Sequence, residues 1–166
     1  MPLTKDQWGG SVENRIRFPL EVAKACIKAI GADRIGMRLS PYGAFNGMVP
    51  DADMNVLYEK LTTELNKLGI AYVHIVDHSS MGAPPVSPEL KDSIRKIFKG
   101  TYILSGGYDL NRANADLAAN KGDLVAFGRP FISNPDLVEK LKTGTPLATP
   151  DMSTFYTPGE KGYTDY

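Results

Sequence analysis

The sequence has little cysteine, no excess of either charge and no long apolar run. Its one cysteine, Cys26, excludes an internal disulfide and is typical of a reducing compartment. Nineteen Lys and Arg residues balance nineteen Asp and Glu residues, so no basic field is available to hold nucleic acid or an anionic membrane surface. No stretch resembles a signal peptide or is long enough to span a membrane. We therefore expect a cytoplasmic protein with neither nucleic-acid nor membrane partners.

The sequence does contain a regular alternation of short apolar runs and helical patterns. Its 166 residues suit a single domain covering residues 1–166. We predict strands, buried on both faces, at 35–39, 71–76, 102–104 and 124–127. We predict helices over 11–30, 55–67, 111–120 and 134–142, with Pro19 kinking or splitting the first, and a further helix that Ile94, Ile97 and Phe98 mark and Gly100 ends. Strand followed by helix, four times over, predicts an α/β fold with a parallel sheet.

Polar residues and glycines gather at or just beyond the carboxyl ends of the predicted strands. They are Arg38, Ser40, Asp77, Ser105, Gly106, Gly107, Gly128 and Arg129. Ligands of (βα)8 TIM barrels bind at this end, and phosphate commonly binds in the last two loops. We therefore favour a barrel of this type over a small open sheet. The chain would supply about four βα units, a half-barrel, followed by a C-terminal tail over residues 145–166.

The segment 124–137 contains the parts of a phosphate site. Gly128 would let the backbone approach an oxyanion, and Arg129 supplies a forked cation. Asn134 is expected to cap a helix that begins at Pro135 and carries Asp136 in its first turn. The alternative for this segment is an ordinary turn between strand and helix with a surface arginine.

Several segments in order resemble the old yellow enzyme family, FMN-dependent NAD(P)H reductases of activated alkenes. They are residues 6–15, 38–43 with Phe45 and Asn46, 105–107, 128–137, 153–156 and 162–166. The resemblance runs nearly end to end but covers only the carboxyl-terminal half of that family's barrel, strands five to eight and the tail. It implies FMN as cofactor, NAD(P)H as reductant and an α,β-unsaturated carbonyl compound as the small-molecule substrate.

The resemblance also assigns roles to individual residues. Arg38 would lie beside the flavin pyrimidine edge, where reduced flavin carries negative charge. Its alternative is a structural arginine paired with a carboxylate such as Asp77. The phosphate would be held by Ser105, Gly106, Gly107, Gly128 and Arg129, and Phe155 would pack near the isoalloxazine. Phe45, Asn46 and Tyr156 would line the substrate pocket, for which the alternative is plain packing.

No residue of this half is assigned a catalytic role, because the family's substrate-activating donors lie upstream of the matching part. We therefore expect the chain to be weakly active or inactive without an amino-terminal half. An exposed half-barrel would have open sheet edges, so we expect a homo-oligomer or association with such a half. Two other functions remain open. One is a non-catalytic flavin- or phosphate-binding half-barrel, and the less favoured one is a phosphosugar isomerase-type barrel.

Three further residues are given structural interpretations. His74 and His78 are too far apart on an extended strand to chelate one metal ion unless the chain turns sharply after Val76, and no third ligand is suggested, so no metal site is assigned. His74 is expected to pack in the barrel wall or to reach a neighbouring carbonyl. Cys26 lies among apolar residues of a predicted helix and is expected in the core.

Overall fold

The computed structural model describes residues 6–45 and 47–166. The chain forms two compact units, Met1–Val125 and Ala126–Tyr166. Within the described residues, no helix has the length and apolar character needed to cross a membrane. The prediction of a single domain stays a prediction, since a compact unit need not fold independently.

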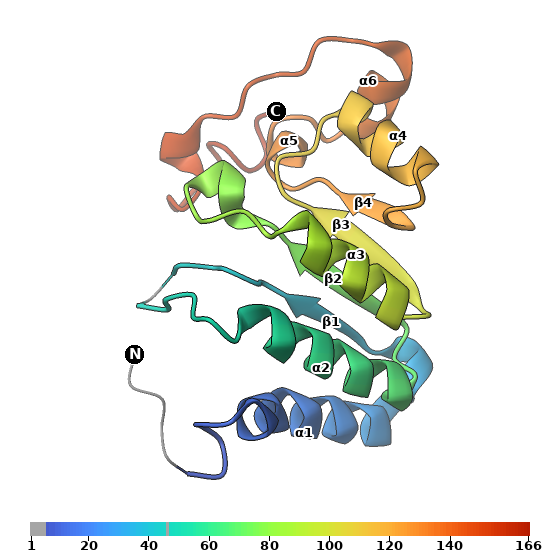
Figure 1. Ribbon diagram of the computed structural model, residues 1–166. Helices are drawn as coiled ribbons and strands as arrows, with labels where there is room; N and C mark the ends of the chain where they lie inside the picture. Colours follow the sequence, from blue (N-terminus) through green and yellow to red (C-terminus); the bar gives the residue numbers. More distant parts are fainter. Residues whose placement is uncertain (1–5, 46) are drawn as a thin grey trace. The chain divides into compact units, whose positions relative to one another are not determined.

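Strands and helices alternate along the first unit, as predicted (Figure 1). The helices are α1 Val12–Ile30, α2 Met54–Leu68, α3 Pro88–Ile97 and α4 Leu110–Ala118. The strands are β1 Gly36–Leu39, β2 Tyr72–Val76, β3 Thr101–Ser105 and β4 Leu124–Ala126, whose last residue belongs to the second unit. The sheet order is β1-β2-β3-β4, and β1 with β2 and β2 with β3 pair in parallel. Parallel neighbours in chain order are the arrangement that successive βα units of a barrel produce.

Local sequence signals explain where the helices begin and end. The Ser11 hydroxyl accepts from the Asn14 amide and caps α1, and Ser87 does the same for α3 with Pro88 in its first turn. Gly69 adopts the left-handed conformation that ends α2. Helix α1 continues through Pro19 as one element, so of the two expected effects the split is wrong, and the kink stays a prediction. The proline removes one hydrogen bond, which a helix of 19 residues can lose without ending.

The core of the first unit lies between the sheet and its helices. Alternate strand residues are buried there, including Leu39, Val73, Ile75, Tyr102 and Leu104. The intervening residues point to the other face of the sheet, where Tyr72 is 40% exposed and Leu124 is 53% exposed. The expectation that the strands are buried on both faces is therefore wrong for this chain. No described helix of the first unit covers this second face, which we call the open face.

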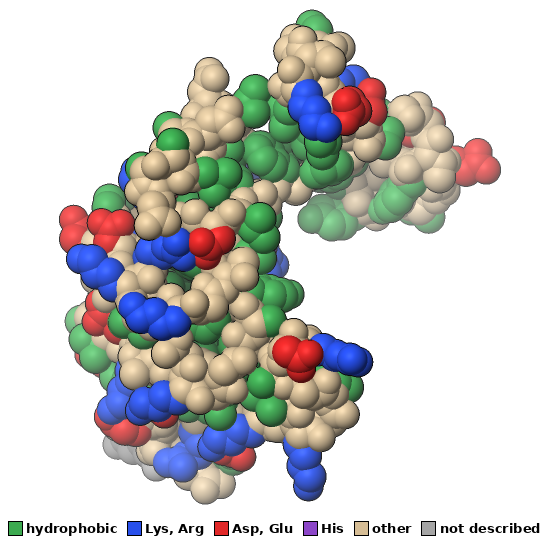
Figure 2. Space-filling model, turned by 90° about the vertical axis from the view of Figure 1, so that its right-hand side faces the viewer, with side chains coloured by type: hydrophobic (Ala, Val, Ile, Leu, Met, Phe, Trp, Pro, Cys, Tyr) green, Lys and Arg blue, Asp and Glu red, His purple; other side chains and the backbone are tan. Residues whose placement is uncertain are grey.

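Cys26 is exposed on α1, so its predicted place in the core is also wrong. The buried stripe of the helix, which includes Ile16 and Ala23, joins the core and packs beside α2. Figure 2 shows positive and negative side chains interspersed on the visible surface, with no large patch of one sign.

The second unit contains two short helices, α5 Arg129–Ile132 and α6 Leu137–Thr143. Asn134 is fully buried between them, and its amide donates to the carbonyls of Pro130 at 2.8 Å and Ala148 at 3.0 Å. Its side-chain oxygen accepts from the Ala148 N–H at 2.8 Å. Asn134 therefore ties the tail to the α5 turn. The predicted cap at Asn134 and helix start at Pro135 are wrong, because α6 begins at Leu137.

Candidate functional site

Arg38 is an exposed arginine on the open face of the sheet. It lies on β1 in register with His74 on β2. Within residues 6–45 and 47–166, its guanidinium makes no ion pair and no hydrogen bond. The alternative partner Asp77 instead accepts from Lys91 at 2.6 Å, so the Arg38–Asp77 pairing is wrong. A guanidinium presented without an acidic partner is suited to an anionic or strongly accepting ligand.

Two histidines lie near this guanidinium. Burial lowers the pKa of His74, and the positive charge of Arg38 lowers that pKa further. The same two causes lower the pKa of His78, with Asp77 partly opposing them. Both rings are therefore neutral at pH 7, and Arg38 supplies the positive charge of this part of the open face. The Nε2 atom of His74 is buried and has no hydrogen-bond partner in the described chain, so it does not reach a neighbouring carbonyl.

A glycine turn follows β3 at its carboxyl end. Gly106 has φ +116° and Gly107 has φ +61°, both in the region that side chains disfavour. A Cβ on Gly106 would lie 2.3 Å from the Asp77 carbonyl oxygen, so only glycine fits there. Neither N–H donates a hydrogen bond to any other described residue. Consecutive unpaired N–H groups in such a turn can receive an oxyanion, so the turn fits a phosphate group.

Side chains from α4 and its flanking loops surround this turn. Arg112 Nη1 donates to the Gly106 carbonyl at 3.0 Å, and its guanidinium lies 4.0 Å above the Tyr108 ring. The Tyr108 hydroxyl donates to Asp116 at 2.8 Å, and Lys121 donates to the same carboxylate at 2.9 Å. Sequence reasoning missed these residues. The signal that could have found them is Arg112, an arginine in the first turn of the helix that comes soon after the Gly106–Gly107 pair.

Asp77, the residue directly after β2, supports the same turn. It is 4% exposed and accepts hydrogen bonds from Lys91 Nζ at 2.6 Å and from the Ser79 N–H at 3.0 Å. Burial acts to raise the pKa of Asp77, but the bonds from Lys91 and Ser79 outweigh it and lower that pKa. Asp77 is therefore ionised at neutral pH, and its backbone lies against Gly106.

Lys91→Met is expected to lower the free energy of unfolding at pH 7 by about 2 kcal/mol, because it leaves a buried carboxylate without its cation. The folded-state pKa of Asp77 is lowered, so this stabilisation is present above pH 4 and is lost as the pH falls through the folded pKa. Urea unfolding from pH 7 downward measures it, and the difference from wild type should shrink in acid. Lys67→Met is the control, since Lys67 and Glu64 form an exposed pair. Equal losses in both variants would contradict this role of Lys91.

Phe45 lies beyond the carboxyl end of β1 and contacts His78 beyond β2. Their ring centroids are 4.9 Å apart in an edge-to-face arrangement, and Phe45 is 39% exposed. Asn46, the neighbouring predicted pocket residue, lies outside the described residues. His78 was not predicted from the sequence as a partner of Phe45. The signal that could have indicated a site residue is the position of His78 just beyond the carboxyl end of a strand. The substrate-pocket role of Phe45 stays a prediction.

The remaining predicted site residues belong to the second unit. Space is open around the Cα of Gly128, and Arg129 is half-buried at the start of α5 without an ion pair to any described acid. Phe155 is half-buried, and its carbonyl accepts from the Tyr163 hydroxyl at 3.0 Å. Tyr156 is 95% exposed. The proposed roles of these four residues stay predictions.

Residues 4–148 match the family described as the NADH:flavin oxidoreductase / NADH oxidase family. Chanoclavine-I aldehyde reductase of Penicillium roqueforti is 43% identical over 97% of this chain and 45% of its own length. Morphinone reductase has a similar structure, with a TM-score of 0.92 and 44% identity over 98% of this chain and 44% of that one. The old yellow enzyme homologue of Zymomonas mobilis gives a TM-score of 0.90 and 36% identity, covering 98% and 46% of the two chains. The chain thus spans less than half the length of these relatives.

Proposed function

Because the chain belongs to the NADH:flavin oxidoreductase / NADH oxidase family, we propose that it is the FMN-binding half of a reductase of activated C=C bonds. The predicted membership of the old yellow enzyme family and the predicted parallel α/β architecture of its barrels are confirmed. This membership favours the proposal over the phosphosugar isomerase alternative. The substrates we propose are α,β-unsaturated carbonyl compounds.

The unpaired guanidinium of Arg38 carries this proposal. FMN, when bound, would pass reducing equivalents from NAD(P)H to the substrate's double bond. Arg38 would hold a positive charge beside the pyrimidine edge, where negative charge gathers on reduction. Its position on the open face, with neutral His74 and His78 as neighbours, leaves that charge available to a ligand.

The Gly106–Gly107 turn is the proposed phosphate site of the first unit. Its two unpaired N–H groups would donate to phosphate oxygens, and Ser105 at the end of β3 precedes them. The Ser105 hydroxyl already donates to the Ile75 carbonyl at 3.3 Å, so its side chain would help to fix the strand end. We propose Gly128 and Arg129 as the second set of phosphate ligands, supported by the unpaired guanidinium of Arg129.

Aromatic residues would form the substrate side of the site. Phe45 with Asn46, and Tyr156 from the tail, are proposed to line the pocket, while Phe155 would pack near the isoalloxazine. Exposed aromatic rings suit a flat substrate that must stack on a heterocycle. We assign no proton donor to the described residues.

The chain is proposed to act with a second half-barrel, either an amino-terminal half or another copy of itself. The open face, with exposed Tyr72 and Leu124, supports this, since soluble proteins avoid leaving such apolar sheet faces uncovered. β1 also stands at an edge of the sheet. The alternative of a non-catalytic flavin- or phosphate-binding half-barrel stays a prediction.

Titration with FMN, followed by flavin fluorescence and absorption, tests the proposal. The wild-type chain is expected to bind FMN weakly. Arg38→Met should weaken binding about tenfold, the value of one lost charge-assisted contact. Arg34→Met is the control, since Arg34 is an exposed arginine of the same unit in the turn before β1. Failure of the wild-type chain to bind FMN, or equal effects of both substitutions, would contradict the proposal.

A further inference from the structure

We infer that Arg112 is a positioning residue that sets the Gly106–Gly107 turn for phosphate binding. This inference rests on the proposed function and adds a residue outside the glycine turn to it. Arg112 is not placed in contact with the cofactor. It would act through the backbone that it holds.

The peptide geometry links the Arg112 contact to the proposed ligand side. Arg112 Nη1 holds the Gly106 carbonyl oxygen at 3.0 Å. That carbonyl and the Gly107 N–H belong to one trans peptide, in which the two groups point in opposite directions. The hydrogen bond from Arg112 of α4 to this carbonyl therefore orients the Gly107 N–H away from Arg112. That N–H donates to no other residue within the described ranges, so it is available to a phosphate oxygen.

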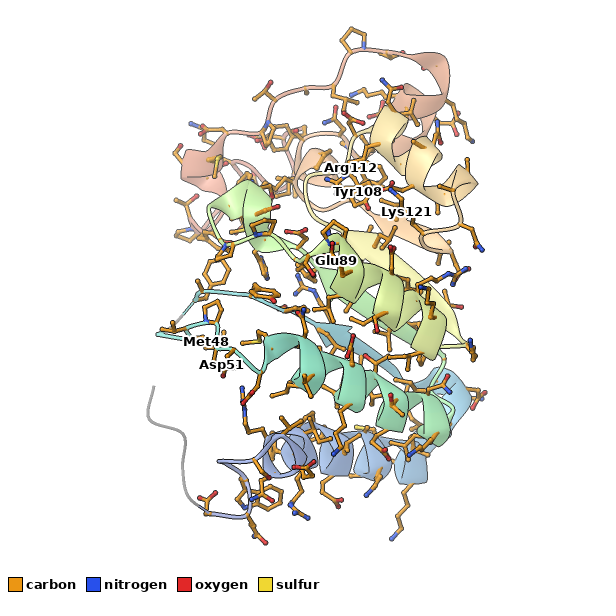
Figure 3. All side chains as sticks on the ribbon, in the orientation of Figure 1. Met48, Asp51, Glu89, Tyr108, Arg112 and Lys121 are labelled. Carbon is orange, nitrogen blue, oxygen red and sulfur yellow. The ribbon has the colours of Figure 1, made fainter. Side chains whose placement is uncertain are left out.

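The guanidinium of Arg112 is itself held in place. It lies 4.0 Å above the Tyr108 ring, and the Tyr108 hydroxyl donates to Asp116 at 2.8 Å. Burial and the Asp116 carboxylate raise the pKa of Tyr108 to about 12, so the phenol remains a donor at neutral pH. Lys121 pairs with the same carboxylate at 2.9 Å. Figure 3 shows Tyr108, Arg112 and Lys121 close to one another beside α4.

The turn is also fixed from the strand side. A Cβ at Gly106 would collide with the Asp77 backbone, which shows how closely β2 approaches the turn. Asp77 is anchored by Lys91 at 2.6 Å. Gly106 is therefore held by Asp77 on one side and by Arg112 on the other. Such a turn loses little conformational freedom when an anion binds, which is the advantage of a preorganised site.

An ordinary stabilising arginine offers a matched control. Arg95 on α3 donates to both Asp123 oxygens, at 2.6 and 2.8 Å, and to Asn120. Asp123 also accepts from the Tyr102 N–H, so Arg95 braces the start of β3 as Arg112 braces the turn at its end. Loss of Arg95 should affect stability without affecting phosphate recognition.

The experiment compares FMN with riboflavin, which has the same heterocycle but no phosphate. Affinities for both are measured with the wild-type chain, Arg112→Gln, Arg112→Lys and Arg95→Gln, after circular dichroism has established folding. Arg112→Gln should weaken FMN binding five- to tenfold and leave riboflavin binding unchanged. Arg112→Lys, which keeps a donor for Gly106 but cannot stack on Tyr108 in the same way, should fall between. Arg95→Gln should keep the wild-type ratio of the two affinities.

The outcomes separate this inference from the proposed function. A wild-type chain that binds FMN no more tightly than riboflavin overturns the phosphate role of the turn, and the inference with it. A wild-type chain that prefers FMN, with the same preference in Arg112→Gln, overturns the inference alone. The Gly107 amide resonance provides a second readout that needs no ligand. It should shift in Arg112→Gln and not in Arg95→Gln, and an unmoved resonance would overturn the inference.

Discussion

A chimera in which this chain replaces the matching part of morphinone reductase is expected to reduce 2-cyclohexenone at least 100-fold faster than the chain alone. The chain and that enzyme share 44% identity and a TM-score of 0.92 over the matching part, so the halves should be compatible. The chain contributes Arg38 and the Gly106–Gly107 turn, whereas we assign it no donor for the substrate carbonyl. Loss of one such donor costs an enzyme about two to three orders of magnitude in rate.

The measurement is anaerobic bleaching of the flavin by NADH or NADPH, followed by reoxidation with cyclohexenone. Arg38→Met in the chimera is the matched variant, and it should slow bleaching while the fold is kept. Equal turnover by the isolated chain would show that the second half is dispensable. A folded chimera without bound flavin would contradict the assignment of FMN binding to this half.

Gly106→Ala is expected to remove measurable FMN binding and to lower the free energy of unfolding by about 2 kcal/mol. The added Cβ would lie 2.3 Å from the Asp77 carbonyl oxygen, at a residue with φ +116°, so the backbone of the turn must move. Movement of the turn would also break the Arg112 contact and reorient the Gly107 N–H.

The control for this substitution is Gly69→Ala at the end of α2. Gly69 has φ +67°, but a Cβ there meets nothing within 4 Å, so alanine adds backbone strain without a collision. Thermal unfolding and FMN titration should show a stability loss in both variants and a loss of FMN binding in Gly106→Ala alone. Normal FMN binding by Gly106→Ala would contradict the phosphate role of the turn.

The parts of the fold that local sequence determines were predictable. Leucines at helical spacing (Leu57, Leu61, Leu65 and Leu68) and the glycine that follows them define α2, and the strands fall where the apolar runs are. The exposure of the open face was not predictable in the same way. A strand of a half-barrel has the same apolar sequence as a strand of a complete barrel. The sequence of the strand therefore does not indicate whether its second face is covered.

Two sets of contacts depend on tertiary structure, and sequence reasoning missed them. Asp77 and Lys91 are 14 residues apart, and nothing in the intervening sequence indicates that α3 returns its lysine to the end of β2. Asn134 is of a residue type that often caps helices, but its side chain donates to the carbonyl of Ala148 in the tail. In both cases a distant segment competes with the local pattern and determines the side chain's partner.

A crystal structure of the chain with FMN tests the central claim most directly. We predict phosphate oxygens within hydrogen-bonding distance of the Gly106 and Gly107 N–H groups, with the pyrimidine edge of the flavin facing the Arg38 guanidinium on the open face of the sheet. A phosphate bound on the helix side of the sheet, or a flavin ring that leaves Arg38 without contact, would contradict the account.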